Sequence, residues 1–178
     1  MGQYYKVIIL GEKSSDNKEH IRFYIEIWYG NKLTEHSYLE NPFMNAIEFL
    51  ISPLGSFYKS RLVWAGDYAD PEIGYEQNLY SLVEDEHNKE YIPKSAKLCE
   101  EYKYIVNHTK KQYIDKSKYK SIHPLSLIIA EGNGRGGGDY HGSHEDKIGS
   151  WSRDVISIEK ELLPEYTEFE YKFGEEEI

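Results

Sequence analysis

The sequence predicts an α+β fold: a single compact domain in which an antiparallel or mixed sheet, built from hairpins, carries two or three short helices. Short apolar or alternating runs are separated by polar turns, which is typical of strands joined in hairpins. Helical spacing of apolar residues occurs only in a few separated stretches, which favours α+β over a regular α/β alternation. The chain has 178 residues, 39% of them hydrophobic, which suffices for one domain with its own core.

The first two strands are expected over residues 4–10 and 22–28. Residues 7–10 form a continuous apolar run that ends at Gly11, while Phe23, Ile25 and Ile27 alternate with polar residues. A polar turn over residues 14–19 separates the two runs. This pattern predicts a hairpin.

The longest predicted helix begins at Asn41-Pro42. Asparagine is a favoured N-cap, and proline suits the first helical position, where its missing N–H costs nothing. Apolar residues then recur at helical spacing until Ser52-Pro53 ends the run. A second, short helix is expected around Leu79 and Leu82, and one or two helical turns are expected over residues 124–130.

The remaining strands are expected over residues 61–65, 102–107, 112–115 and 155–159, with a second hairpin between the two in the middle. Residues 167–173 alternate aromatic and charged residues, which predicts an edge strand. We therefore expect one α+β domain over residues 1–158, followed by an acidic segment over residues 159–178. That segment holds eight glutamates and two lysines, a charge of −6 within a total of −10.

Composition argues against several classes of protein. Outside the acidic segment the net charge is only −4 (−10 less −6), so broad binding to duplex nucleic acid is not expected. No apolar run approaches the roughly 20 residues of a membrane span, and the first residues lack a signal-peptide pattern. Cys99 is the single cysteine, which excludes disulfide bonds within the chain and multi-cysteine zinc sites. We expect a cytoplasmic protein without a membrane partner.

Six of the fourteen glycines lie between Gly132 and Gly142. Ordering such a run costs backbone entropy, so a run this rich in glycine suggests that the backbone must approach a ligand closely. Its amides can then line an anion site, and Arg135 can close over the anion with two parallel N–H donors. The run lacks the Gly-Lys-Ser/Thr ending of a P-loop, and its G-x-G-x-x-G match lacks a following helix. An exposed surface loop is the alternative. The expected ligand contacts here are Asn133, Gly134, Arg135, Gly136, Gly137, Gly138, Asp139 and Tyr140.

Two further groups of polar residues are candidates for the same site. Asp67 directly follows a predicted strand, where a carboxylate can contact a ligand, although an aspartate there can equally cap its own turn. His108 and Lys110 lie at the tip of the second hairpin, where a lysine suits a phosphate. An exposed polar hairpin tip is the ordinary alternative.

Trp151 and Arg153 precede the strand expected at residues 155–159. The indole can stack on a base while the guanidinium holds an anion. A tryptophan at the start of a strand more often packs in the core or at its rim, so stacking is the less favoured role.

A metal centre is a minority interpretation. It would combine Asp139, His141 and His144 with Asp67 or His36, but the recognised zinc spacings are absent. We therefore assign no metal, no cofactor and no catalytic residue. Whether the protein is an enzyme stays open, and the sequence favours a binding protein.

Five segments carry a resemblance to a known family: MGQYYK (residues 1–6), VWAGDYAD (63–70), YIVNHTKK (104–111), EGNGRGGGDY (131–140) and GSWSRDVI (149–156). They resemble a family of small proteins found in phage, prophage and bacterial genomes. The resemblance implies a compact domain up to about residue 159 and a bacterial host cell as the setting. It implies no reaction and no catalytic residues.

These observations predict a phage-associated accessory protein, with a counter-defence role, that binds a small anionic, nucleotide-like ligand at the glycine-rich run. One alternative is an acidic inhibitor of a nucleic-acid-binding host defence enzyme, in the manner of anti-CRISPR proteins. Another is a metal-assisted nucleotide hydrolase that uses Asp67, Asp139 and His141. The partner is thus a nucleotide-like ligand or a host defence protein, and the oligomeric state is open.

Overall fold

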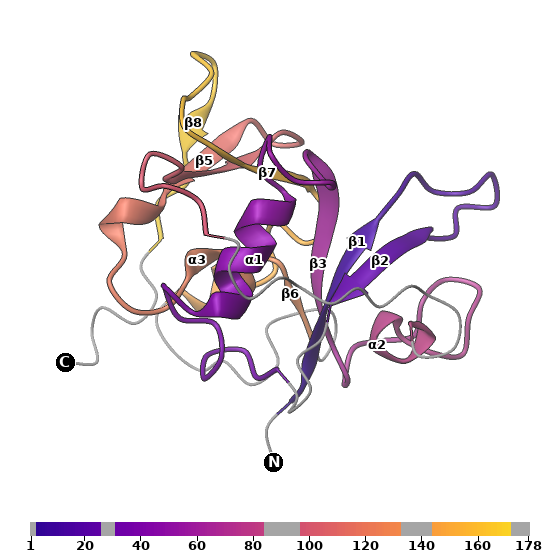
Figure 1. The fold of residues 1–178 in the computed structure, drawn as a ribbon. Coiled ribbons are helices and arrows are strands. Elements are labelled where there is room, and N and C mark those ends of the chain that lie inside the picture. Colours follow the sequence, from indigo (N-terminus) through magenta and orange to yellow (C-terminus); the bar gives the residue numbers. More distant parts are fainter. Residues whose placement is uncertain (1–2, 26–30, 84–96, 133–143, 172–178) are drawn as a thin grey trace.

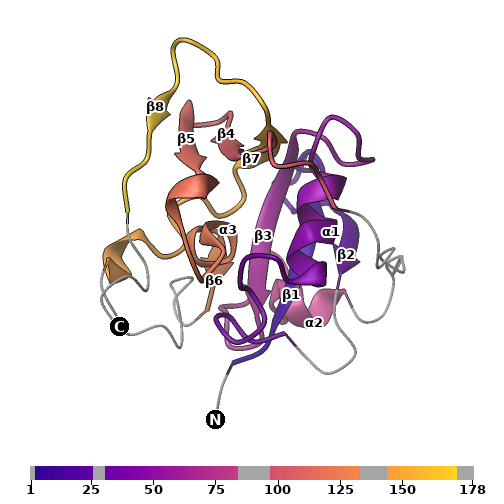
Figure 2. The same cartoon turned by 60° about the vertical axis from the view of Figure 1, so that its left-hand side comes forward.

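The predicted α+β architecture is confirmed in a computed structural model, which describes residues 3–25, 31–83, 97–132 and 144–171 (Figures 1 and 2). Within these ranges a mixed sheet of eight strands is accompanied by three short α-helices. The strands are β1 (Tyr5–Leu10), β2 (Ile21–Ile25), β3 (Ser60–Gly66), β4 (Tyr104–Asn107), β5 (Gln112–Asp115), β6 (Ala130–Glu131), β7 (Val155–Glu159) and β8 (Thr167–Glu168). The helices are α1 (Pro42–Leu50), α2 (Leu79–Leu82) and α3 (Pro124–Ile128), with 3₁₀ turns η1 (Lys116–Lys118) and η3 (Glu145–Lys147).

The strand order is β2-β1-β3-β7-β4-β5-β8, and β6 joins β3 outside this path. Neighbouring strands are antiparallel except for two pairs, β3 with β6 and β5 with β8, which are parallel. Both predicted hairpins are present, with Val7 opposite Ile25 in the first and Ile105 opposite Ile114 in the second. Residues 26–28 of the second predicted strand lie outside the described ranges.

Helix α1 begins where the sequence predicts. The Asn41 side chain accepts a hydrogen bond of 2.8 Å from the Phe43 amide, and Pro42 occupies the first turn. Phe43, Met44 and Ile47 are buried on the face that meets the sheet. The N-cap satisfies an amide that the helix itself leaves unpaired, so the local sequence determines this start.

The stretch after Pro124 is shorter as a helix than the sequence predicts. Helix α3 ends at Ile128, and Ala130 and Glu131 pair with β3 instead. The Trp64 amide donates to the Ile129 carbonyl at 3.0 Å, so main-chain pairing with β3 ends the helix. An uninterrupted apolar run gives no period by which such a switch from helix to strand can be recognised.

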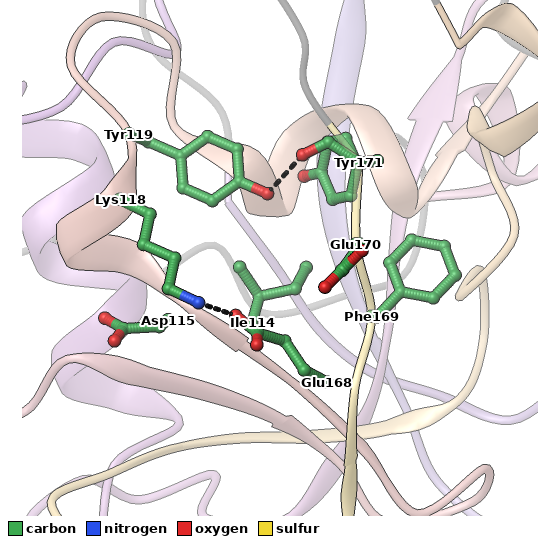
Figure 3. Close-up of a pocket in the computed structure, with 8 residues that line it drawn as sticks. All are labelled: Ile114, Asp115, Lys118, Tyr119, Glu168, Phe169, Glu170 and Tyr171. Atoms are coloured by element: carbon green, nitrogen blue, oxygen red, sulfur yellow. Dashed lines mark hydrogen bonds and ion pairs between the residues drawn. The ribbon is translucent and has the colours of Figure 1, made fainter.

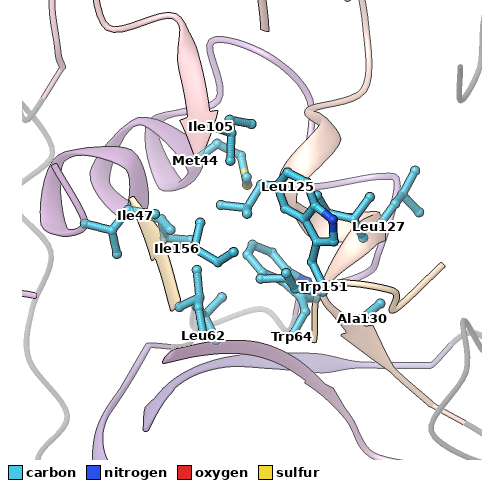
Figure 4. Close-up of a cluster of buried hydrophobic side chains, with 14 of the residues drawn as sticks. Met44, Ile47, Leu62, Trp64, Ile105, Leu125, Leu127, Ala130, Trp151 and Ile156 are labelled. Atoms are coloured by element: carbon cyan, nitrogen blue, oxygen red, sulfur yellow. The ribbon is translucent and has the colours of Figure 1, made fainter. Parts of the chain in front are cut away.

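The two faces of the sheet differ in what covers them. On one face, Val7, Ile9, Leu62 and Trp64 belong to the main hydrophobic cluster, which includes residues of α1 and α3 (Figure 4). On the other face, the alternate residues of β1 and β3 pack with Leu79 of α2 in a smaller cluster. Figure 1 shows α1 and α2 on opposite sides of β3. No helix in the described residues is both long and apolar enough to span a bilayer.

One edge of β3 is shared by two strands that diverge from each other. Ser60 and Arg61 pair with β7, whereas Trp64 and Ala65 pair with β6. Between them, the Arg153 amide donates to the Leu62 carbonyl at 2.9 Å, and the Leu62 amide donates to the Asp154 carbonyl at 3.2 Å. The sheet therefore divides along this edge of β3.

Candidate functional site

The candidate site lies where β3 and β6 end. These strands are parallel, with Ala65 opposite Glu131, so their carboxyl ends lie side by side. Strand β3 continues into Asp67, and β6 continues into the buried Gly132, the first residue of the glycine-rich run. The structure thus places Gly132, the first residue of the run, at the same edge as the end of β3 that leads into Asp67. The expected contacts at residues 133–140 lie outside the described residues.

Gly66 permits β3 and β6 to approach each other at this end. A Cβ atom at position 66 would lie 2.6 Å from the Glu131 carbonyl oxygen and 2.5 Å from Nε2 of Gln3. Such a contact with a backbone oxygen forces the strands apart. The absence of a side chain at Gly66 is therefore a structural requirement of the site.

Asp67 ties the loop after β3 to the start of β1. Its Oδ1 accepts a hydrogen bond of 3.1 Å from the Tyr4 amide, and its own amide donates to the Tyr4 carbonyl at 2.9 Å. Asn78, the N-cap of α2, donates from Nδ2 to the carbonyls of Asp67 and Ala69, at 3.0 Å each. The Asp67 side chain thus bonds to the segment that begins β1, and not to an amide of its own turn, in the bond described here. Its contact with a ligand stays a prediction.

Two exposed tyrosines neighbour Asp67 along the backbone, and the sequence analysis did not select either of them. Tyr4 is 40% exposed and Tyr68 is 47% exposed. Tyr4 is joined to Asp67 by one bond from its amide to the Asp67 side chain and one from the Asp67 amide to its carbonyl, and Tyr68 follows Asp67 in the chain. Side chains alternate between the two faces of a strand, so the expected burial of Tyr5 was the signal in the sequence that could have indicated an exposed Tyr4. These rings are accessible to a planar ligand.

Trp151 is fully buried, which excludes base stacking, the less favoured of the two roles considered from the sequence. Its ring centroid lies 5.2 Å from that of Phe169, and its indole N–H donates to Oε1 of Gln112 at 3.0 Å. Figure 4 shows the indole among the side chains of the main core. Since no face of the ring is accessible, we assign Trp151 to packing instead of base stacking.

Arg153 is the centre of a cluster of five charged side chains, the Arg153 cluster: Glu19, Arg61, Glu72, Glu131 and Arg153. Its Nε and Nη2 donate to the Glu131 carboxylate at 2.7 and 2.8 Å, and its Nη1 donates to Glu72 at 3.0 Å. Arg61 holds Glu19 in a bidentate pair at 2.7 and 2.9 Å, and Glu19 also lies 3.4 Å from Arg153. The guanidinium of Arg153 is therefore engaged with carboxylates of its own chain and not open to a ligand anion.

The Arg153 cluster is largely buried, and its charges stabilise one another. Burial alone would lower the pKa of Arg153, but hydrogen bonds and charge from Glu72 and Glu131 raise it above its ordinary value. Burial alone would raise the pKa of Glu19, but the hydrogen bonds and charge of Arg61, with the charge of Arg153, lower it overall. Arg153 and Glu19 are thus both charged at neutral pH.

The Arg153 cluster positions the strand that leads into the glycine-rich run. Arg153 itself adopts a left-handed conformation, with φ of 67°, in the turn just before β7. From there it reaches Glu131 at the end of β6 and Glu72 in the loop that follows β3. Its role in the described structure is to hold these two segments together.

His108 belongs to a hydrogen-bonded chain of five side chains. The Tyr166 hydroxyl lies 3.0 Å from Nδ1, and Nε2 lies 2.7 Å from Oγ of Ser157. Ser157 donates to Oε1 of Glu159 at 2.8 Å, and Tyr58 donates to the same oxygen at 2.6 Å. Because Ser157 gives its proton to Glu159, His108 must donate from Nε2 and accept at Nδ1. This assignment satisfies every member with a neutral imidazole.

The electrostatics of this chain agree with that assignment. Burial, aided by the charge of Lys59 and opposed by that of Glu159, lowers the pKa of His108. Burial and the hydrogen bond to Glu159 raise the pKa of Tyr58 to about 12. Ser157 is fully buried and donates away from the imidazole, so the arrangement is not that of an activated nucleophile.

Lys110, the other hairpin-tip candidate, is also engaged within the domain. Its ammonium pairs with Asp154, and its amide donates to Oδ1 of Asn107 at 2.9 Å. Asn107 in turn donates from Nδ2 to the Asp154 carboxylate at 2.8 Å. These contacts fit the alternative interpretation of a structured polar hairpin tip.

The described residues contain no group of three or more histidine, cysteine, aspartate or glutamate side chains arranged to hold a metal ion. Asp139 and His141, which the metal interpretation requires, lie outside the described residues. His144 and His36 are described, and His36 accepts a hydrogen bond of 3.0 Å at Nδ1 from the Lys32 amide. A metal site stays a prediction that depends on residues 139 and 141.

Comparison with known proteins gives no relative from which a functional site could be transferred, so the candidate site is argued from its geometry alone. No protein-family model matches the sequence, and neither a curated protein nor a solved structure matches it.

Proposed function

We propose that the protein binds a small anionic, nucleotide-like ligand at the carboxyl ends of β3 and β6, as an accessory protein of phage or prophage origin. The observation that carries the proposal is the parallel pairing of the strand that enters the glycine-rich run with the strand that enters Asp67. In open sheets, ligands bind beyond the carboxyl ends of such strands, at points where the strand connections diverge. The carboxyl ends of β3 and β6 are such an edge, since β7 pairs with the start of β3 at Ser60 and Arg61 and leaves Trp64 and Ala65 to β6.

Each part of the ligand has a chemically suitable partner in this proposal. Amides of the glycine-rich run hold the phosphate groups, and the Arg135 guanidinium provides two parallel N–H donors to them. A base stacks on an exposed tyrosine ring, Tyr4 or Tyr68, in place of the buried Trp151. The ion pairs of Glu131 fix the strand that enters the run.

The first experiment measures nucleotide binding to the full chain by isothermal titration calorimetry, with a panel of mononucleotides, dinucleotides and cyclic nucleotides. We expect Arg135→Ala to abolish binding while the melting temperature of the free protein stays nearly unchanged. Arg22→Ala is the matched control, because it removes the same charge from an exposed position on β2, which is separated from β6 by β1 and β3. Equal affinities of wild type and Arg135→Ala would refute the site.

The second experiment separates phosphate binding from base binding. Replacing both rings (Tyr4→Ala with Tyr68→Ala) should weaken a nucleotide by about 5- to 150-fold, the range expected for loss of one stacked base. The same variant should bind inorganic pyrophosphate as the wild type does. Loss of both ligands would show that the rings act on the fold and not on a base. Repeating the panel with EDTA tests metal-assisted hydrolysis, which requires turnover that the chelator stops.

A second candidate function is inhibition of a nucleic-acid-binding host enzyme. The favouring observation is charge: residues 159–178 carry −6 of the total −10. Reversing Glu175, Glu176 and Glu177 to lysine should abolish inhibition if these carboxylates replace phosphates on the host enzyme. Retained inhibition would exclude this segment as the contact.

A further inference from the structure

A second concave site lies at the β8 edge of the sheet, separated from the β3–β6 site by β7, β4 and β5. A pocket with a volume of about 230 Å³ opens between the β5–η1 segment and residues 168–171 (Figure 3). Strand β8 borders it and is the last strand in the sheet order. The parallel pairing of Gln112 with Thr167 and of Tyr113 with Glu168 holds the two walls together.

The pocket combines aromatic walls with acidic side chains. Tyr119, Phe169 and Tyr171 contribute rings, and the centroids of Tyr119 and Phe169 lie 5.6 and 5.5 Å from that of Tyr171. The Tyr119 hydroxyl donates to the Tyr171 carbonyl at 2.7 Å, which fixes these two residues across the pocket. Carboxylates come from Asp115, Glu168 and Glu170. Aromatic faces and carboxylates both favour a cation.

One cation of the protein already lies in this pocket. The Lys118 ammonium pairs with Glu168, as the dashed line in Figure 3 shows. The hydrogen bond to Glu168, together with the charges of Glu168 and Asp115, raises the pKa of Lys118 above its ordinary value, although desolvation opposes it. Three carboxylates against one ammonium leave the lining with a net charge of −2. The pocket can therefore accept a further positive group.

The size of the pocket limits what that group can be. Small-molecule sites typically enclose about 300–1,000 Å³, so a volume of about 230 Å³ is too small for a nucleotide but sufficient for one side chain. We infer that this pocket receives the guanidinium or ammonium group of a single arginine or lysine side chain from a basic partner protein. This inference does not depend on the ligand site at β3 and β6.

The experiment titrates the full ¹⁵N-labelled chain with N-acetyl-arginine-amide and follows backbone amides by NMR. Amides over residues 114–119 and 167–171 should shift, with millimolar affinity, because a single exposed cation site binds weakly. N-acetyl-citrulline-amide is the matched ligand control, since it has the same shape without the charge. Equal shifts with citrulline, or no shifts in these segments, would overturn the inference.

Three variants sharpen this test. Glu170→Lys, at an exposed position, should weaken arginine binding by about tenfold, whereas Lys118→Gln should strengthen it about two- to five-fold by removing the internal competitor. Neutralising the terminal carboxylates (E175Q, E176Q and E177Q together) is the control for general charge and should leave affinity unchanged. Loss of binding in that control, or an unaltered affinity in well-folded Glu170→Lys, would contradict the assignment of the pocket.

Discussion

The two faces of the sheet are stabilised by different chemistry. Among the described residues, the cluster on the α1 side contains 25 buried hydrophobic residues, whereas the cluster on the α2 side contains eight. The Arg153 cluster lies on the same face of β3 as the smaller cluster. Arg61 is on the face of Val63 and Ala65 because side chains alternate along the strand, and Glu131 is on that face because it pairs with Ala65. Charged groups thus occupy space that the opposite face fills with apolar side chains.

The two faces therefore contribute differently to the fold: one supplies more of the free energy of folding, and the other fixes the relative positions of the strands and loops. Burial of apolar area is non-directional and supplies most of the favourable free energy of folding. Buried ion pairs gain little net free energy because desolvation offsets their attraction, but they are costly to break. They are also directional: the two forks of Arg153 and Arg61 hold the β1–β2 hairpin, β6 and the loop after β3 in one arrangement. The face beside the candidate site is the one fixed by directional bonds.

The largest loss is expected on the apolar face. Trp151→Ala should lower the free energy of unfolding by about 3–5 kcal/mol, because it leaves a cavity in the main cluster and removes the indole partner of Gln112. Urea denaturation monitored by circular dichroism measures this change. A loss below about 1 kcal/mol would show that the cluster collapses around the missing ring.

Removing the central charge of the opposite face comes next. Arg153→Ala removes the guanidinium that pairs with the buried Glu72 and Glu131 and should cost about 3 kcal/mol. Arg153→Lys, which keeps a charge but not the fork, should recover only part of that loss in the same denaturation assay. Full recovery by lysine would mean that charge alone, and not bidentate geometry, matters here.

A smaller difference separates two ways of removing Arg153. Its φ of 67° disfavours any residue with a Cβ, so Arg153→Gly should be about 1 kcal/mol more stable than Arg153→Ala. Both variants lose the same ion pairs, so their difference reports backbone conformation alone. If the two variants have equal free energies of unfolding, the chain must relax out of the left-handed region once the guanidinium is gone.

The smallest effect concerns pH and the neutral His108. Its pKa in the folded protein is lowered from the ordinary 6.5, so the unfolded chain takes up a proton first as pH falls. The free energy of unfolding should therefore decrease below about pH 6.5 and level off below the folded-state pKa. His108→Gln, which can accept from Tyr166 and donate to Ser157, should lessen this dependence. A curve unchanged by glutamine would assign the loss to other groups.

The sequence predicted the parts of the fold that depend on local patterns. Asn41 and Pro42 marked the start of α1 correctly, and alternation together with polar turns located both hairpins. Strand β6 was missed because two residues following an apolar run have no period of their own, and their strand character comes from pairing with β3. Local pattern therefore accounts for the elements but not for all of their pairings.

The candidate site was predicted only in part. Asp67 and the glycine-rich run stood out by composition, and their proximity depends on the β3–β6 pairing. Arg153 was identified as a cation, but its partners Glu131 and Glu72 are 22 and 81 residues away in the chain. Neither the ion pairs nor the burial of Trp151 can be read from a single sequence, because both depend on how distant segments pack.

The junction at the edge of β3 has a consequence for how the chain folds. Strands β1–β3 come from residues up to 66 and strands β4–β8 from residues after 103, and the two portions meet in the sheet where β3 pairs with β7 and β6. The side chains of Ile47, Leu62, Ile105 and Ile156, contributed by both portions, fill a common interior (Figure 4). Neither portion can shield its apolar surface from water by itself. Both must therefore assemble in one cooperative transition, governed by contacts between distant parts of the sequence.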